Sequence, residues 1–107
     1  MMVAFSPQVY SDIINLTDIL VEKEYISSYP FAVKYVDDLI DYIEAHIESR
    51  PHKIAPPFFR KYGTDLRYIT YNRSHNVTWF ILFETHPNGY LVKYITNNQY
   101  EGQYFNI

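Results

Sequence analysis

Apolar residues recur at helical spacing through the first half of the chain. One apolar stripe follows Ser6-Pro7, a typical helix start with serine as N-cap and proline in the first turn. A second start signal, Ser27 or Ser28 before Pro30, precedes a second stripe that ends before Arg50-Pro51. The two stripes consist of Val9, Ile13, Leu16 and Leu20, and of Ala32, Val36, Leu39, Ile43 and Ile47. The pattern predicts two amphipathic helices joined as an antiparallel hairpin.

The rest of the pattern is typical of strands. Residues 3–5 form a short apolar run, and from Asp65 onward the period changes to two. Three strands are predicted there, at 66–71, 77–83 and 90–96, with a strong turn signal at Pro87-Asn88-Gly89 between the last two. The strand at 77–83 is apolar on both faces, as in a central strand that is covered on each side. The proline-containing segment from Pro51 to about Thr64 is expected to be a loop, and the tail from Asn97 irregular or a short helix.

This order predicts an α+β fold for the whole chain, residues 1–107, as one domain. The helical hairpin should pack on one face of a four-stranded, mostly antiparallel sheet in the order β-α-α-β-β-β. On the opposite face, the sheet and the loop that follows the second helix should form a shallow concave surface.

Charge is segregated along the chain. Residues 7–50 carry nine carboxylates and three cations, a net charge of −6, whereas residues 51–73 carry five cations and one carboxylate, a net charge of +4. The whole chain has a net charge of −3. Electrostatic fields are local on the scale of a Debye length, roughly 8 Å at physiological salt. The basic segment is therefore a candidate anion-binding region within an acidic protein.

Composition excludes several classes of protein. The chain has no cysteine, so disulfides and thiolate metal sites are ruled out, and the spacing of its four histidines matches no metal-ligand motif. No metal or other cofactor is expected. No run approaches the ~20 apolar residues of a membrane span, and no signal peptide is visible, so a cytoplasmic protein without a membrane partner is expected. Twelve tyrosines favour wet interfaces and base stacking.

The element order resembles the RelE/ParE superfamily of toxins from bacterial toxin–antitoxin (plasmid stabilisation) systems. The resemblance spans nearly the whole chain and is carried by residues 3–7 entering the first helix, the Leu66-Arg67 pair, residues 79–83 and residues 90–95. It implies one of two activities. Ribonuclease members cleave mRNA on the ribosome without a metal, whereas members of the other branch poison DNA gyrase. It also implies a cognate antitoxin that wraps the toxin and holds it inactive.

The chain departs from the ribonuclease pattern in two respects. Its sequence pI is about 5.7, whereas ribonuclease members are usually strongly basic. Its last strand is followed by Asn97-Asn98-Gln99-Tyr100, where many members carry a basic or histidine-rich cluster. Three hypotheses therefore stay open: a metal-independent endoribonuclease, a non-catalytic gyrase inhibitor, and an inactive member that binds only its antitoxin.

Metal-free RNA cleavage needs a cation on the phosphate, a base for the 2′-hydroxyl and an acid for the leaving oxygen. Arg67 is the candidate cation, with Leu66 packing inward under the helices; the alternative is a solvated arginine paired to Glu84 or Asp65. His86 and Tyr100 are the candidates for proton transfer. The alternatives are a solvated turn histidine and a tail aromatic packed on the sheet edge. The enzyme hypothesis requires Tyr100 to reach Arg67.

A further set of residues is predicted to bind RNA. The cations would supply a phosphate-steering field, or simply offset the acidic helices. The two asparagines would bind a base edge or the antitoxin backbone, or would cap the end of the last strand. The set consists of Lys53, Arg60, Lys61, Arg73, Asn97 and Asn98.

Overall fold

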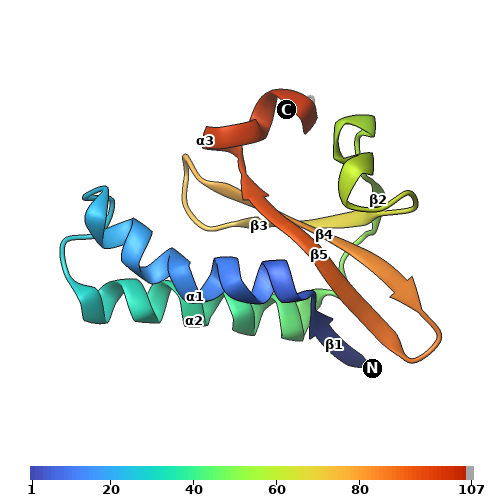
Figure 1. Cartoon of the computed structure of the whole chain (residues 1–107), viewed down its shortest axis with the longest axis horizontal. Helices are drawn as coiled ribbons and strands as arrows, with labels where there is room; N and C mark the ends of the chain where they lie inside the picture. The colour runs from blue at the N-terminus through green and yellow to red at the C-terminus, as the bar shows by residue number, and fades with distance from the viewer. Residues whose placement is uncertain (106–107) are drawn as a thin grey trace.

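A mixed sheet of five strands, with a helical hairpin on one face, forms the framework of the protein (Figure 1). The computed structural model describes residues 1–105. The strand order is β1-β5-β4-β3-β2, in which β1 is parallel to β5 and every other neighbouring pair is antiparallel. The strands are β1 (Met2–Phe5), β2 (Lys53–Ile54), β3 (Arg67–Asn72), β4 (Thr78–His86) and β5 (Gly89–Asn97).

Both helices begin at the predicted serines. Helix α1 (Pro7–Glu22) is capped by Ser6, whose Oγ accepts a hydrogen bond from the Val9 N–H at 3.3 Å. Helix α2 (Tyr29–His46) is capped in the same way by Ser28. Each cap satisfies a backbone donor that has no partner within its helix. The predicted hairpin is therefore confirmed.

The α+β class is confirmed, but the predicted number of strands is wrong. The additional strand, β2, has two residues, paired with Tyr68 and Arg67 of β3. Two residues are too short to show a period, so the segment reads as loop in the sequence. The same segment also holds a 3-10 helix, η1 (Pro57–Tyr62).

The sheet separates two apolar cores. In β4, alternate side chains enter opposite cores: Ile81 packs beneath the helices, and Phe80 and Leu82 pack on the other side. This arrangement confirms that β4 is covered on both faces. The core beneath the helices includes Val9, Leu39, Ile43, Ile47, Ile69, Trp79, Ile81, Phe83, Tyr90 and Val92. The second core includes Phe59, Leu66, Tyr68, Phe80, Leu82 and Phe105.

The second core closes the sheet face that was expected to be open. Helix η1 supplies Phe59, and the tail supplies Phe105, whose ring stacks on Phe80 with 3.7 Å between centroids. The tail forms a short helix, α3 (Asn98–Glu101), and a 3-10 turn, η2 (Gly102–Phe105), so the prediction of a short helix there is confirmed. Aromatic side chains thus fill the predicted concave surface.

The orientation predicted for Leu66 and Arg67 is inverted. Leu66 is buried in the second core, away from the helices. Arg67 lies opposite Phe83 of β4, and residues paired across a sheet point to the same face. Phe83 belongs to the core beneath the helices, so Arg67 is on the helix side of the sheet, at the exposed end of β3. Among residues 1–105, no helix is long and apolar enough to cross a membrane.

Candidate functional site

Arg67 and His86 line one shallow hollow at the end of the sheet where β3 begins and β4 ends. Alternation along β4 puts Phe83, and with it Arg67, on the helix side and Glu84 and His86 on the other side, so the hollow extends around the end of the sheet. The hollow has a volume of about 540 Å³, and its other lining residues are Thr64, Asp65, Glu84 and Thr85. Within residues 1–105, the Arg67 side chain makes no hydrogen bond or ion pair, so its guanidinium is available to a ligand. The expected alternative, an Arg67 paired to Glu84 or Asp65, is not observed.

A carboxylate orients the histidine of this hollow. His86 Nε2 lies 3.0 Å from Glu84 Oε1, and the His86 side chain is about half exposed, at 53%. Glu84 also faces Lys93, with 4.0 Å between Oε2 and Nζ. Such a carboxylate holds one ring nitrogen and leaves the other free to exchange a proton. Glu84 was not predicted in this role from the sequence, although a spacing of two residues in a strand places both side chains on one face.

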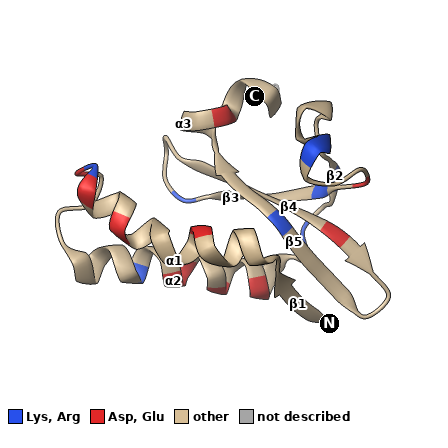
Figure 2. Cartoon of the chain, viewed as in Figure 1, with Lys and Arg blue, Asp and Glu red and all other residues tan. Residues whose placement is uncertain are grey.

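The predicted phosphate-binding cations lie in several places. Arg60 and Arg67 line a second hollow of about 180 Å³ next to the first, which makes Arg60 the cation beside the site. Lys53 lies with Arg50 along a different hollow, and Lys61 stacks over Phe58 at 4.2 Å. Figure 2 shows carboxylates along the helical hairpin and most of the lysines and arginines on the sheet and η1. The basic segment thus does not form one continuous patch.

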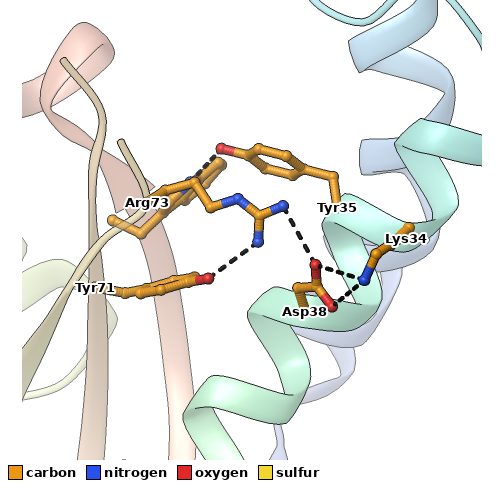
Figure 3. A network of polar contacts seen from close by, with 6 residues as sticks. Lys34, Tyr35, Asp38, Tyr71 and Arg73 are labelled. Atoms are coloured by element: carbon orange, nitrogen blue, oxygen red, sulfur yellow. Dashed lines mark hydrogen bonds and ion pairs between the residues drawn. The ribbon is translucent and has the colours of Figure 1, made fainter. Parts of the chain in front are cut away.

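Arg73 has a structural role (Figure 3). Its guanidinium lies over the Tyr35 ring at 4.1 Å, donates to the Tyr71 hydroxyl at 3.0 Å and pairs with Asp38 at 3.4 Å. The side chain is only 20% exposed, and it follows the end of β3 opposite to Arg67. Arg73 therefore ties the β3–β4 turn to α2. The structure does not bring it to the phosphate site predicted from the sequence.

The two asparagines after β5 also make internal contacts. Asn97 is 5% exposed, and its Oδ1 accepts hydrogen bonds from the backbone N–H groups of Gln99 and Tyr100, which caps α3. Asn98 accepts a bond from the Thr78 N–H at 2.9 Å and donates to a backbone carbonyl at 3.1 Å. Of the expected roles, the structure supports capping at the end of the strand.

Tyr100 lies far from Arg67. Arg67 pairs with Phe83 and Asn97 pairs with Trp79, so the two positions are four residues apart along β4, roughly 13 Å at 3.3 Å per residue. Tyr100 lines a separate cavity. There, a hydrogen bond with Tyr25, together with burial, raises the pKa of Tyr100. The structure does not bring Tyr100 to Arg67, as the enzyme hypothesis requires.

A second polar network lies under the tail. The Tyr94 and Thr96 hydroxyls both donate to Glu101 Oε1, at 2.5 and 2.6 Å. Burial, and to a smaller extent the hydrogen bond with Glu101, raises the pKa of Tyr94 well above its usual value. Tyr94 also stacks on Tyr62 with 4.0 Å between ring centroids. This network holds α3 against β5, and nothing in the local sequence pattern predicts it.

No cluster of three or more histidine, aspartate or glutamate side chains in residues 1–105 could hold a metal ion. No protein-family model, curated protein or solved structure matches the chain. The proposals below therefore depend on the element order and on the geometry of the two ends of the sheet.

Proposed function

We propose that the chain is the toxin component of a type II toxin–antitoxin system of the RelE/ParE kind, and that it cleaves mRNA without a metal. The observation that carries the proposal is the hollow shared by Arg67 and His86, in which the arginine has no partner among residues 1–105 and the histidine contacts Glu84. The order of strands and helices supports the family part of the proposal, because the hairpin precedes the antiparallel strands as the resemblance implies.

The chemistry uses two side chains. The Arg67 guanidinium binds the nonbridging oxygens of the scissile phosphate in a bidentate manner and stabilises the charge that develops there. His86, oriented by Glu84, removes the proton of the 2′-hydroxyl. The 2′-oxygen then forms a bond to phosphorus while the bond to the 5′-oxygen breaks, and water protonates the leaving oxygen. The products are a 2′,3′-cyclic phosphate and a 5′-hydroxyl end.

Induced expression in bacteria, followed by mapping of mRNA 5′ ends, tests this function. The wild type should arrest growth and produce new 5′-hydroxyl ends. Arg67→Ala should reduce the rate of cleavage by a factor of about 100 or more, because the variant lacks a charged contact to the transition state. Lys34→Ala is the matched control, because Lys34 is 72% exposed on α2 and pairs only with Asp38. Wild-type growth arrest with intact mRNA would exclude the ribonuclease.

A non-catalytic function is the second candidate. The separation of Tyr100 from Arg67 favours it, because the hollow then lacks the aromatic acid that the enzyme hypothesis assigned. Growth arrest with intact mRNA and halted replication would indicate an inhibitor of DNA gyrase. Absence of toxicity, with a small neighbouring protein still co-purifying, would indicate an inactive member that binds only its antitoxin.

A further inference from the structure

An apolar cavity of about 200 Å³ lies at the Tyr100 end of the sheet. Its lining residues come from the end of α1, the α1–α2 connection and α2 on one side and from the start of β4, the end of β5 and α3 on the other. An engineered apolar cavity of about 150 Å³ accepts benzene, so this one has room for a single aromatic ring. Its apolar lining includes Leu16, Leu20, Ile26, Val77 and Trp79.

Asn97, a largely buried residue of the lining, has an accessible side-chain donor that makes no hydrogen bond within residues 1–105. Asn97 is 95% buried and both its α3-capping bonds use Oδ1, whereas Nδ2 donates to no group within residues 1–105. No fully enclosed side-chain nitrogen or oxygen in those residues lacks a partner, so Nδ2 must reach accessible space, and the space that Asn97 lines is this cavity. The Trp79 indole N–H is already engaged, at 2.9 Å from the Tyr35 hydroxyl. Among the described residues, the cavity therefore presents Asn97 Nδ2 as a donor from a largely buried residue, and the side-chain amide of exposed Gln99 lies at its edge.

The rim of the cavity is apolar and exposed. Ile19 is 37% exposed, Tyr25 57% and Tyr100 52%. A small molecule inside the cavity would leave this rim in water, whereas a protein segment would cover it, and tyrosine is enriched at protein interfaces. No lysine or arginine lines the cavity, and the residues just before Tyr25 in the sequence, Glu22, Lys23 and Glu24, carry a net charge of −1. This net negative charge disfavours a phosphate-bearing ligand.

We infer that this cavity is a docking pocket for one aromatic side chain of a partner protein. The ring fills the space above Trp79, and the backbone carbonyl beside it accepts a hydrogen bond from Asn97 Nδ2. The flanking part of the partner segment is neutral or basic, to match the net negative charge near Tyr25. The inference is independent of RNA cleavage, because the pocket and the Arg67 hollow share no lining residue.

The probe for the test is N-acetyl-phenylalanine amide, which carries one ring and two peptide carbonyls. Trp79 is the only tryptophan of the chain, so its indole N–H gives a single NMR signal from the cavity wall. The probe should shift this signal saturably, with the other shifts confined to lining residues. N-acetyl-alanine amide, which lacks the ring, should leave the signal unchanged at the same concentrations.

Asn97→Asp isolates the donor. Aspartate keeps the oxygen that caps α3 and is itself a good N-cap, but it replaces Nδ2 with an acceptor. Affinity for the probe should fall about tenfold, while the thermal unfolding midpoint stays within a few degrees of the wild type. Asn15→Asp, at an exposed position of α1, is the matched control and should bind like the wild type.

Four results would overturn the inference. The first is no saturable shift in the folded wild type. The second is equal binding of toluene with no effect of Asn97→Asp, which indicates a pocket for small apolar molecules. The third is tighter binding of uridine 5′-monophosphate with the same shifts, which indicates a nucleotide site. The fourth is a shift that depends on protein concentration alone, which indicates that a second copy of the chain fills the pocket.

Discussion

Replacing Phe105 with alanine should destabilise the whole fold, although the residue lies close to the C-terminus. Its ring is 5% exposed and stacks on Phe80 at 3.7 Å, with Phe59 and Tyr68 each 5.0 Å away. A fully buried phenylalanine replaced by alanine costs about 3–5 kcal/mol, from lost apolar transfer and the cavity left behind. The tilted and edge-on contacts with Phe59 and Tyr68, at centroid distances that favour aromatic pairs, place Phe105→Ala in the upper half of that range.

Urea unfolding, followed by the fluorescence of Trp79, measures this loss. Trp79 packs in the core beneath the helices, so its signal reports on the whole sheet and not on the tail alone. Phe31→Ala is the matched control, because Phe31 is 67% exposed on α2 and alanine is the better helix former. The control should change the free energy of unfolding by less than about 0.5 kcal/mol.

A loss below about 1 kcal/mol for Phe105→Ala would refute the reasoning. It would mean that the tail detaches at little cost, so that the second core is not part of the cooperative unit. Hydrogen exchange gives an independent check, because the β4 and β5 amides should lose protection together with the tail. If only the amides of α3 and η2 lose protection, the tail is a separate local unit and the predicted coupling fails.

Two further outcomes follow from the polar networks. Arg73→Met should lower the free energy of unfolding by about 1–2 kcal/mol through loss of the contacts with Asp38 and two tyrosines. Under the proposed ribonuclease activity, the variant should cleave mRNA like the wild type, and reduced cleavage by the folded variant would indicate that Arg73 contributes to RNA binding. The raised pKa of Tyr94 means that, above about pH 10, the unfolded chain loses this proton while the folded chain keeps it. Stability should therefore fall as the pH rises above 10. Tyr94→Phe should make that fall shallower, as measured by urea unfolding across pH, whereas exposed Tyr10→Phe should not.

The helices could be predicted because their determinants are local. Ser6 and Ser28 cap the backbone within three residues of themselves, and each apolar stripe repeats over several turns. The second core could not be predicted in this way. It depends on Phe59, from a proline-rich segment, meeting Phe105, 46 positions later in the sequence, and neither residue belongs to a periodic pattern.

At the candidate site too, the features that depend on neighbouring residues could be predicted, and those that depend on strand pairing could not. The alternation of a strand correctly separates Leu66 from Arg67, but alternation alone does not say which of the two faces the helices. The register of β3 against β4 shows which one it is: Arg67 lies opposite Phe83, and Phe83 is beneath the helices. In the same way, the sequence identifies His86 and Tyr100 as candidate proton-transfer groups. Only the pairing of β4 with both neighbours shows that His86 is at the Arg67 end of the sheet and Tyr100 at the other.

The distance between the two ends of the sheet constrains how a partner bound in the pocket beside Trp79 could block Arg67. The pocket beside Trp79 and the hollow beside Arg67 are separated by at least the roughly 13 Å between their positions on β4. The helical hairpin covers the direct path between them on that face, since Ile81 and Phe83 are both fully buried beneath it. A segment anchored by one ring in the pocket must therefore continue for more than four extended residues around the edge of the sheet before it can obstruct Arg67. A partner shorter than this would bind the pocket and leave Arg67 accessible.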